Sequence, residues 1–249
     1  MEKLVKINDL SAKIYLPDTM PTEILIGIHG FFGDKESSVL VKLGNNLIEN
    51  KIALVTFDLP CHGANDTSNL LKLSDCIQAI ESVFDWVHKN YPNINVSIFA
   101  TSFGGYLTLL YLSNHPTHLN KIILRAPAIN MSHVLEEVLL PYQSLTAEDL
   151  KTPTNIGKEQ FLLVNYAFIE ELRNNNLHQT KPVDHFLYII QGKQDNIVNP
   201  DDNARFFNKF YPNKHKIIYF ENADHRFKKP GELDRIIKET LAILNENVI

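Results

Sequence analysis

The sequence predicts an α/β fold in which helices flank a mostly parallel sheet of about eight strands. Three observations support this: short runs of consecutive apolar residues recur, helical periods separate them, and 249 residues suffice for one such domain. Consecutive apolar positions are typical of strands buried on both faces of a parallel sheet. The runs are Ile24–Ile28, Ile52–Phe57, Val96–Ala100, Ile122–Leu124, Phe186–Ile190 and Ile217–Phe220.

The N-terminal segment starts with a weaker strand signal. Leu4–Ile7 and Ala12–Leu16 indicate an antiparallel, hairpin-like pair of strands. Farther along, apolar residues at 3–4 spacing predict a helix with Ser74 as its N-cap. These residues are Ile77, Ile80, Phe84 and Val87.

Three further helices are expected. One starts after residue 102 and ends before His115-Pro116, because the residue before a proline disfavours the helical conformation. Another begins at Asp201 and Asp202, which we interpret as acids of a first helical turn. The last is opened by Pro230-Gly231. Its apolar face consists of Leu233, Ile236, Ile237, Leu241 and Leu244.

Residues from about 128 to 182 interrupt this alternation. They separate two strands by far more than one crossover helix needs, and they contain the helical pieces "SHVLEEVLL" and "GKEQFLLVNYAFIEELRNN". Long insertions in compact domains are usually functional lids. We therefore expect a single domain over residues 1–249 with a lid or cap at about 128–182.

Composition excludes several classes of protein. The net charge is −5 and the longest basic run is Lys228-Lys229, too short for a nucleic-acid patch. No apolar run approaches the length of about 18 residues that a membrane span needs, and no export signal is visible. Cys61 and Cys76 form no disulfide framework or zinc motif, so we interpret them as reduced thiols and expect a cytoplasmic protein.

The candidate nucleophile is Ser102 in "NVSIFATSFGGYLTLLYL". It follows a strand directly and precedes a helix, and ligands bind at the carboxyl ends of parallel strands. Gly104 and Gly105 leave space where the backbone reverses sharply, and a hydroxyl in such a turn is exposed above the helix N-terminus. The alternative is a serine that merely caps its helix.

A base and an acid are expected at the same edge of the sheet. Of the ten histidines, topology leaves His29, His62, His133, His178 and His225, and His225 in "FENADHRF" follows the last predicted strand. Asp195 in "YIIQGKQDNIVNP" follows the strand before it, and a carboxylate there can fix the histidine tautomer. The rival acids are Asp58, Asp201, Asp202 and Asp224.

The oxyanion donors are expected from two backbone amides. "IGIHGFFGDKESS" ends a strand with a glycine-rich loop, which can direct the Phe31 N–H at the site. The second donor is the N–H of Phe103, the residue after the nucleophile.

Together these motifs resemble the α/β-hydrolase superfamily, and the order Ser102, Asp195, His225 matches that family's order of nucleophile, acid and base. Within it, the chain is most similar to small cinnamoyl/feruloyl carboxylesterases and to serine-aminopeptidase-type hydrolases, whose lid likewise follows the sixth strand. Two departures stand out: Ala100 replaces the first glycine of the Gly-x-Ser-x-Gly elbow, and Cys61 replaces a glycine in "DLPCHGAND".

The resemblance implies a serine carboxylesterase that hydrolyses small to medium acyl or aromatic esters, including hydroxycinnamoyl esters, through an acyl-enzyme. No metal or organic cofactor is expected, the partner is a small-molecule ester, and the chain is expected to be a monomer or a homodimer. Substrate contacts are expected from Gly30, Phe31, Phe32, Tyr142, Gln143 and Tyr166.

Three alternatives stay open. A thioesterase would use the same nucleophile and base. A serine aminopeptidase would need an acidic anchor for the substrate amino group, for which the insertion offers Glu136, Glu137, Glu170 and Glu171. A non-catalytic ligand-binding protein on the same fold is the third, because fold does not determine function.

Overall fold

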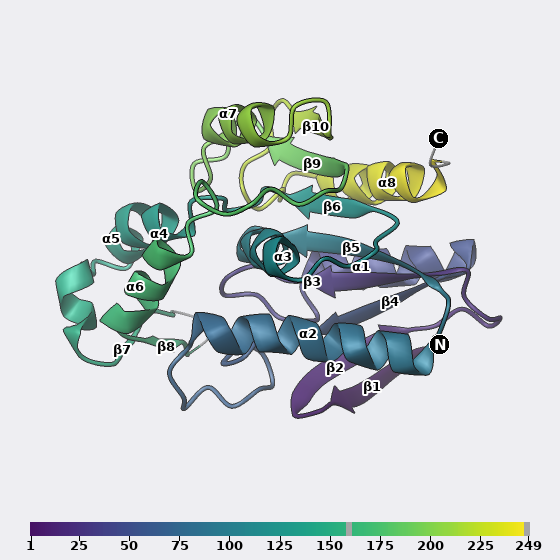
Figure 1. Ribbon diagram of the computed structural model, residues 1–249, viewed down its shortest axis with the longest axis horizontal. Coiled ribbons are helices and arrows are strands. Elements are labelled where there is room, and N and C mark those ends of the chain that lie inside the picture. The colour runs from purple at the N-terminus through teal and green to yellow at the C-terminus, as the bar shows by residue number, and fades with distance from the viewer. Residues whose placement is uncertain (158–160, 247–249) are drawn as a thin grey trace.

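The computed structural model describes residues 1–157 and 161–246 and has one eight-stranded sheet in the order β1-β2-β4-β3-β5-β6-β9-β10. Six neighbouring strands of this sheet, β4, β3, β5, β6, β9 and β10, are parallel to one another. Strand β2 pairs antiparallel with both β1 and β4. Figure 1 shows the parallel strands with their arrowheads pointing to one edge. The strands are β1 Glu2–Ile7, β2 Leu10–Tyr15, β3 Glu23–Ile28, β4 Ile52–Phe57, β5 Asn95–Thr101, β6 Ile122–Arg125, β9 Leu187–Gly192 and β10 His215–Phe220.

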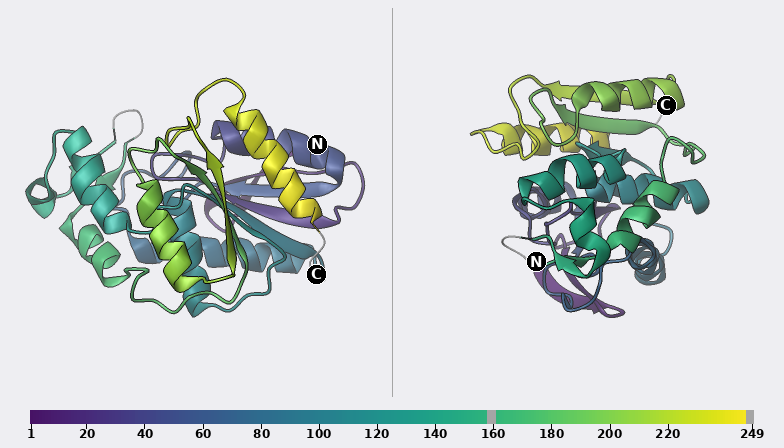
Figure 2. Two further views of the ribbon diagram at one scale, coloured as in Figure 1. Left: turned by 90° about the horizontal axis from the view of Figure 1, so that it is seen from above. Right: turned by 90° about the vertical axis from the view of Figure 1, so that its left-hand side faces the viewer.

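Two hydrophobic cores lie on opposite faces of the sheet. Every residue of β3, β4, β6 and β9 is buried, which agrees with the continuous apolar runs of the sequence. Helices α1 and α8 cover one face, and α2, α3 and α7 cover the other (Figure 2). Their bounds are α1 Ser38–Leu47, α2 Leu73–Asn90, α3 Phe103–Asn114, α7 Pro200–Phe210 and α8 Glu232–Asn245.

The N-cap expected for α2 is wrong. The helix begins at Leu73, so Ser74 lies inside it, and its hydroxyl contacts Asp75 rather than a free backbone amide. The Leu73 N–H is instead satisfied by a carboxylate oxygen of Glu171, 2.7 Å away and 98 residues later in the chain. A tertiary partner therefore does what a local capping side chain was expected to do.

The insertion between β6 and β9 lies beyond the carboxyl ends of the parallel strands (Figure 1). Its first helical segment is continuous, with α4 Met131–His133, a π-helical stretch η2 Val134–Leu139 and α5 Leu140–Tyr142. A 3₁₀ turn η3 Ala147–Lys151 follows, and α6 Tyr166–Asn174 is the second helix. Figure 2 (right) looks onto this insertion.

The second helical piece expected in the insertion is only partly right. Of residues 157–175, those from Tyr166 to Asn174 are helical, and residues 158–160 lie outside the described part of the chain. Leu163–Val164 instead form strand β8, which pairs with β7, Thr154–Asn155. The Leu163 carbonyl also accepts a hydrogen bond from the Leu71 N–H at 2.9 Å, a contact with the main body that local helical spacing does not encode.

Candidate active site

Ser102 lies in the sharp turn that joins β5 to α3. Its backbone angles are φ 52° and ψ −112°, which a residue with a side chain rarely adopts. A Cβ on Gly104 would lie 2.5 Å from the His29 carbonyl oxygen, and one on Gly105 would lie 2.8 Å from Pro127 Cβ. The two glycines thus let the start of α3 pass between β3 and the chain after β6.

The hydroxyl of Ser102 does not cap α3, because no side-chain cap hydrogen bond is formed there. Its Oγ lies 3.1 Å from His225 Nε2 instead. On the other side of the ring, His225 Nδ1 lies 2.8 Å from Asp195 Oδ2. Asp195 is acceptor-only when ionised, so Nδ1 carries the proton and Nε2 accepts from the serine hydroxyl.

The three side chains are largely shielded from water. Ser102 is 8 % exposed, the Asp195 side chain is 0 % exposed, and the His225 side chain is 15 % exposed. The structure therefore brings the serine, the histidine and the aspartate that the sequence singled out into one hydrogen-bonded series.

Asp195 is held by four donors. Its Oδ1 accepts from the backbone N–H groups of Ile197 at 2.9 Å and Val198 at 2.8 Å. Its Oδ2 accepts from His225 and from the Gln191 side-chain amide at 3.1 Å. These bonds fix the orientation of the carboxylate.

The polar network behind Asp195 was not found from the sequence. Gln191 and Asn203 are both fully buried, and Asn203 Nδ2 donates to Gln191 Oε1 at 2.8 Å and to the Pro127 carbonyl at 3.1 Å. A glutamine at the end of an otherwise apolar strand was the available signal, since buried polar side chains are normally hydrogen-bonded.

The loop after β3 runs directly against the Ser102 turn. A Cβ on Gly30 would lie 3.2 Å from Ser102 Cβ, and the Gly33 N–H closes a turn onto the Gly30 carbonyl at 2.9 Å. Among the described residues, neither the Phe31 N–H nor the Phe103 N–H donates to another protein group. Both amides therefore belong to segments beside Ser102, and their N–H groups are available to donate to a ligand.

The ring of Phe31 packs in an aromatic cluster. Its centroid lies 4.8 Å from Phe32, 5.1 Å from Phe103, 5.9 Å from His62 and 6.2 Å from Phe168. Phe168 comes from α6 of the insertion and was not among the expected substrate contacts, because helical spacing marks it only as a buried residue. The insertion thus contacts the Ser102 region through this cluster.

His29 and His62 are buried structural residues. His29 Nε2 accepts from the Leu59 N–H at 2.9 Å, so the ring ties the loop after β3 to the loop after β4. Burial lowers the pKa of His29 to about 4 and that of His62 to about 3. Both rings are neutral at pH 7, and neither contacts Ser102.

The rival acids have other partners. Asp58 is fully buried and forms an ion pair with Lys35 at 2.8 Å. Asp224 Oδ1 accepts from the N–H groups of Arg226 and Phe227, which shapes the turn around His225. Asp201 and Asp202 lie in the first turn of α7, as expected.

Cys61 is buried, and its Sγ lies 3.3 Å from the Asn69 carbonyl oxygen. Burial raises the pKa of the Cys61 thiol to about 11. The thiol is therefore protonated at neutral pH and is a poor nucleophile.

The substrate contacts expected from the insertion are less clearly placed. Tyr142 is 68 % exposed. Gln143 is half-buried, and the half-buried Tyr166 accepts a hydrogen bond from Arg173 at 3.0 Å through its hydroxyl. Of the expected contacts, the structure brings Gly30 and the Phe31–Phe32 pair to the neighbourhood of Ser102.

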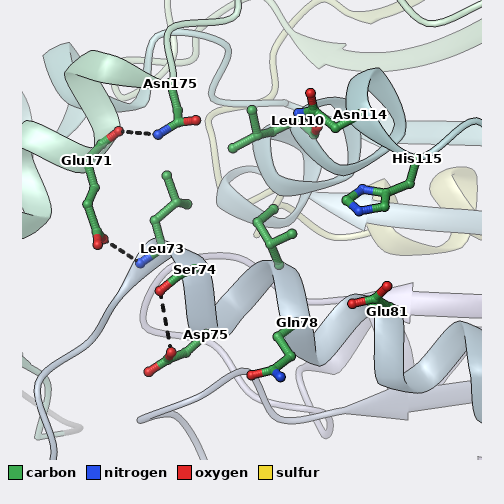
Figure 3. Close-up of a pocket in the computed structure, with 11 residues that line it drawn as sticks. Leu73, Ser74, Asp75, Gln78, Glu81, Leu110, Asn114, His115, Glu171 and Asn175 are labelled. Atoms are coloured by element: carbon green, nitrogen blue, oxygen red, sulfur yellow. Dashed lines mark hydrogen bonds between the residues drawn. The ribbon is translucent and has the colours of Figure 1, made fainter.

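One hollow lies away from Ser102, and another lies against Asp195. A groove of about 620 Å³ runs between α2, α3 and α6, and Figure 3 shows Glu171 reaching across it to Leu73. A smaller pocket of about 250 Å³ lies beside Asp195, against Asn203 and His133. Within residues 1–157 and 161–246, no three His, Cys, Asp or Glu side chains are grouped to hold a metal ion. In the same part of the chain, no helix combines the length and hydropathy that crossing a membrane requires.

Comparison with known proteins gives a consistent result. Residues 19–188 match the family described as Hydrolase_4, Serine aminopeptidase, S33. No curated protein matches the chain.

Three solved structures illustrate the shared fold. Est1E from Butyrivibrio proteoclasticus, solved with ferulic acid bound, is 18 % identical over 96 % of this chain and 98 % of its own, with a TM-score of 0.78. Mouse alpha/beta hydrolase domain-containing protein 10 is 17 % identical over 98 % of each chain, with a TM-score of 0.75. The Paleococcus ferrophilus monoacylglycerol lipase is 17 % identical over 94 % of this chain and 98 % of its own, with a TM-score of 0.71. The predicted α/β-hydrolase fold is confirmed.

Proposed function

The chain belongs to the serine aminopeptidase S33 family of α/β-hydrolases, and on this premise we propose that it is a serine carboxylesterase acting on small to medium acyl or aromatic esters. One observation carries the proposal. Ser102 Oγ, the His225 ring and Asp195 form a continuous series with separations of 3.1 Å and 2.8 Å. These are the distances that a nucleophile, its base and the residue orienting that base require.

The reaction proceeds in two steps. Ser102 Oγ attacks the ester carbonyl carbon while its proton passes to His225 Nε2. The bond from that carbon to the alcohol oxygen then breaks, and the imidazolium gives its proton to the leaving alcohol. In the second step, a water oxygen attacks the acyl carbon while His225 Nε2 takes a water proton. The bond from that carbon to Ser102 Oγ then breaks, the imidazolium returns the proton to Oγ, and the carboxylic acid is released. Asp195 stays ionised throughout and stabilises the imidazolium.

The amides of Phe31 and Phe103 are the proposed oxyanion donors. Both lie beside Ser102, and Phe103 is the first residue of α3, where the helix dipole favours negative charge. Loss of one such donor typically costs about 3 kcal/mol of transition-state stabilisation. The glycine at position 30 supports this role, because the loop can approach Ser102 closely only without a larger side chain there.

The acyl group is proposed to lie against the half-buried rings of Phe31 and Phe32, which form an aromatic cluster with the buried rings of Phe103 and Phe168. The rings of the cluster pack on one another at 4.8–6.4 Å, so Phe31 and Phe32 are backed by apolar side chains, which suits an aromatic or medium-length acyl chain. Ferulic acid, which Est1E binds, belongs to that class. The cluster includes the insertion residue Phe168, so we also propose that residues 128–182 act as a lid within a single domain.

The direct test is turnover of p-nitrophenyl butyrate by the wild type and by Ser102→Ala. We expect Ser102→Ala to lower kcat by more than about 1,000-fold. Ser113→Ala, which makes the same change at the far end of α3, should keep wild-type kcat. Equal, negligible rates for wild type and Ser102→Ala would contradict an esterase and favour a non-catalytic binding protein.

Acyl preference is tested with a panel of acetate, butyrate, octanoate and methyl ferulate esters. Phe168→Leu should lower kcat/KM for the ferulate ester more than for acetate, because it removes the ring that packs behind Phe31. Phe186→Leu is the matched control, since Phe186 is 44 % exposed near the start of β9, at the opposite edge of the sheet. Cleavage of short aliphatic esters alone would contradict the hydroxycinnamoyl assignment, and an acyl-CoA in the same panel tests the thioesterase alternative.

A second candidate is an aminopeptidase, which the family description favours. It needs a carboxylate available to bind a substrate amino group. Glu136 is instead paired with Arg173, and Glu171 accepts from the Leu73 N–H. Of the four acids that the sequence offered, only Glu137 and Glu170 have a side chain without an ion pair or hydrogen bond within residues 1–157 and 161–246. Turnover of aminoacyl p-nitroanilides exceeding that of the esters would make this candidate the better one.

A further inference from the structure

Arg125 is a buried arginine beneath the turn that carries His225. It is the last residue of β6, after the apolar Ile122–Leu124, and it is only 7 % exposed. Its guanidinium carbon lies 4.9 Å from the centroid of the Phe227 ring, two residues after His225. The side chain therefore lies on the face of the sheet covered by α1 and α8.

The guanidinium binds the backbone of the histidine turn. Arg125 Nη2 donates to the Arg226 carbonyl at 2.9 Å and has a longer contact with the His225 carbonyl at 3.4 Å. These carbonyls belong to the two successive peptide bonds on either side of Arg226. Hydrogen bonds from a charged donor are stronger than those from a neutral one.

The charge of Arg125 has no ion-pair partner within residues 1–157 and 161–246. Its Nε is buried without a hydrogen bond. Burial lowers the pKa of Arg125 to about 10, while the charges of Asp195 and Asp224 oppose that shift. Arg125 is thus cationic at neutral pH. A buried, unpaired cation is unfavourable, so packing alone does not explain an arginine at this position.

Other contacts hold other groups of the turn. The Asp224 carboxylate accepts from the N–H groups of Arg226 and Phe227. The Ala223 carbonyl accepts from the Gln194 N–H at 3.0 Å, which ties the turn to the loop of Asp195. The carbonyls of His225 and Arg226 themselves are bound by Arg125.

We propose that Arg125 is the positioning residue of the triad: by binding the His225 and Arg226 carbonyls, it fixes the imidazole between Asp195 and Ser102. This inference rests on the proposed hydrolase function, because it assigns Arg125 a role in that reaction. Arg125 touches neither the substrate nor the reacting atoms, and it acts through the backbone of the turn.

The test compares Arg125→Lys, Arg125→Gln and Arg125→Met with the wild type. A displacement of about 1 Å in a catalytic group can cost about 100-fold in rate, so we expect Arg125→Met to lower kcat of p-nitrophenyl butyrate hydrolysis by about that factor. Arg125→Lys keeps the charge and one donor group, and should lower kcat by about tenfold. KM should change less than about twofold in each, because ground-state binding is untouched.

Arg205→Lys and Arg205→Met are the matched controls. The Arg205 side chain is 71 % exposed on α7, and these substitutions should leave kcat unchanged. A second readout does not depend on turnover: the downfield proton resonance of His225 Nδ1–H, in its hydrogen bond to Asp195, should weaken or shift in the Arg125 variants. Circular dichroism melts establish that each variant is folded.

Several results would overturn the inference. These are a wild-type kcat in Arg125→Met, a loss carried by KM alone, or an unchanged Nδ1–H resonance in a folded variant. If none of the three variants folds, Arg125 is a residue of general stability and the inference is also wrong. Absence of turnover in the wild type would instead defeat the proposed function, and the resonance would still report on Arg125.

Discussion

Gly104→Ala is expected to impair both folding and catalysis, because α3 crosses the end of β3 without room for a side chain. An added Cβ would lie 2.5 Å from the His29 carbonyl oxygen and 2.8 Å from that of Ile28, both backbone atoms. Ordinary contact begins at 3.4 Å, so the helix start or the strand end must move by about 0.9 Å. Overpacking of this kind typically costs about 1–3 kcal/mol of unfolding free energy.

The same displacement would reach the reacting groups. Gly104 is two residues from Ser102 and adjoins Phe103, whose amide is a proposed oxyanion donor. A shift approaching 1 Å should lower kcat by about 10- to 100-fold. Urea unfolding measures the stability change, and p-nitrophenyl butyrate turnover measures kcat.

The control for Gly104→Ala is Ser113→Ala on the last turn of the same helix, which should retain both stability and kcat. A Gly104→Ala protein with wild-type stability and kcat would refute the reasoning, since it would mean that α3 can shift to make room for the added Cβ without any cost. A loss of stability with unchanged kcat would refute only the claim that crowding between position 104 and the end of β3 displaces Ser102.

Three further predictions concern the residues around the triad. Asp195→Asn should lower kcat by about 10,000-fold with a small change in KM, because the wrong histidine tautomer is favoured; steady-state kinetics beside Asp201→Asn check this. Gln191→Leu should lower kcat by about tenfold, since Asp195 loses a donor and Asn203 Nδ2 loses an acceptor; unchanged kcat in a folded variant would contradict it. The free energy of unfolding should fall as pH decreases from about 6.5 to 4. Buried His29 has a pKa of about 4 and stays neutral in the folded protein, whereas a histidine of the unfolded chain binds a proton near pH 6.5. Between these two pH values the unfolded chain therefore binds more protons, which costs about 3 kcal/mol of stability for His29. Unfolding free energies measured across this range should show a shallower slope for His29→Asn, and an equal slope would disprove the assignment.

The sequence was sufficient to predict the strands of the sheet. Strands such as Ile52–Phe57 are buried on both faces, so nearly every position is apolar and the segment is recognisable without its neighbours. The Ser102 turn was predictable for a similar reason, because the strand, the hinge and the glycines lie within a few consecutive residues. The positions of Asp195 and His225 followed from topology, since residues after parallel strands gather at one edge.

Tertiary structure decided what depends on residues far apart in the chain. The partner of the α2 N-terminus is Glu171, 98 residues away from Leu73, and the strand formed by Leu163–Val164 depends on partners outside its own segment. Phe168 becomes part of the aromatic cluster only because the insertion folds back over the loop after β3.

The polar residues that hold the triad in place also came only from the tertiary structure. Arg125 is the last residue of β6 and Gln191 the second-last of β9, and no local pattern says which backbone group or side chain they reach. The spacing of apolar residues within a segment predicts which of them are buried, because each strand or helix faces the core with a fixed set of its own positions. The choice of hydrogen-bond partner is encoded in no segment, because it is made only when two distant segments meet.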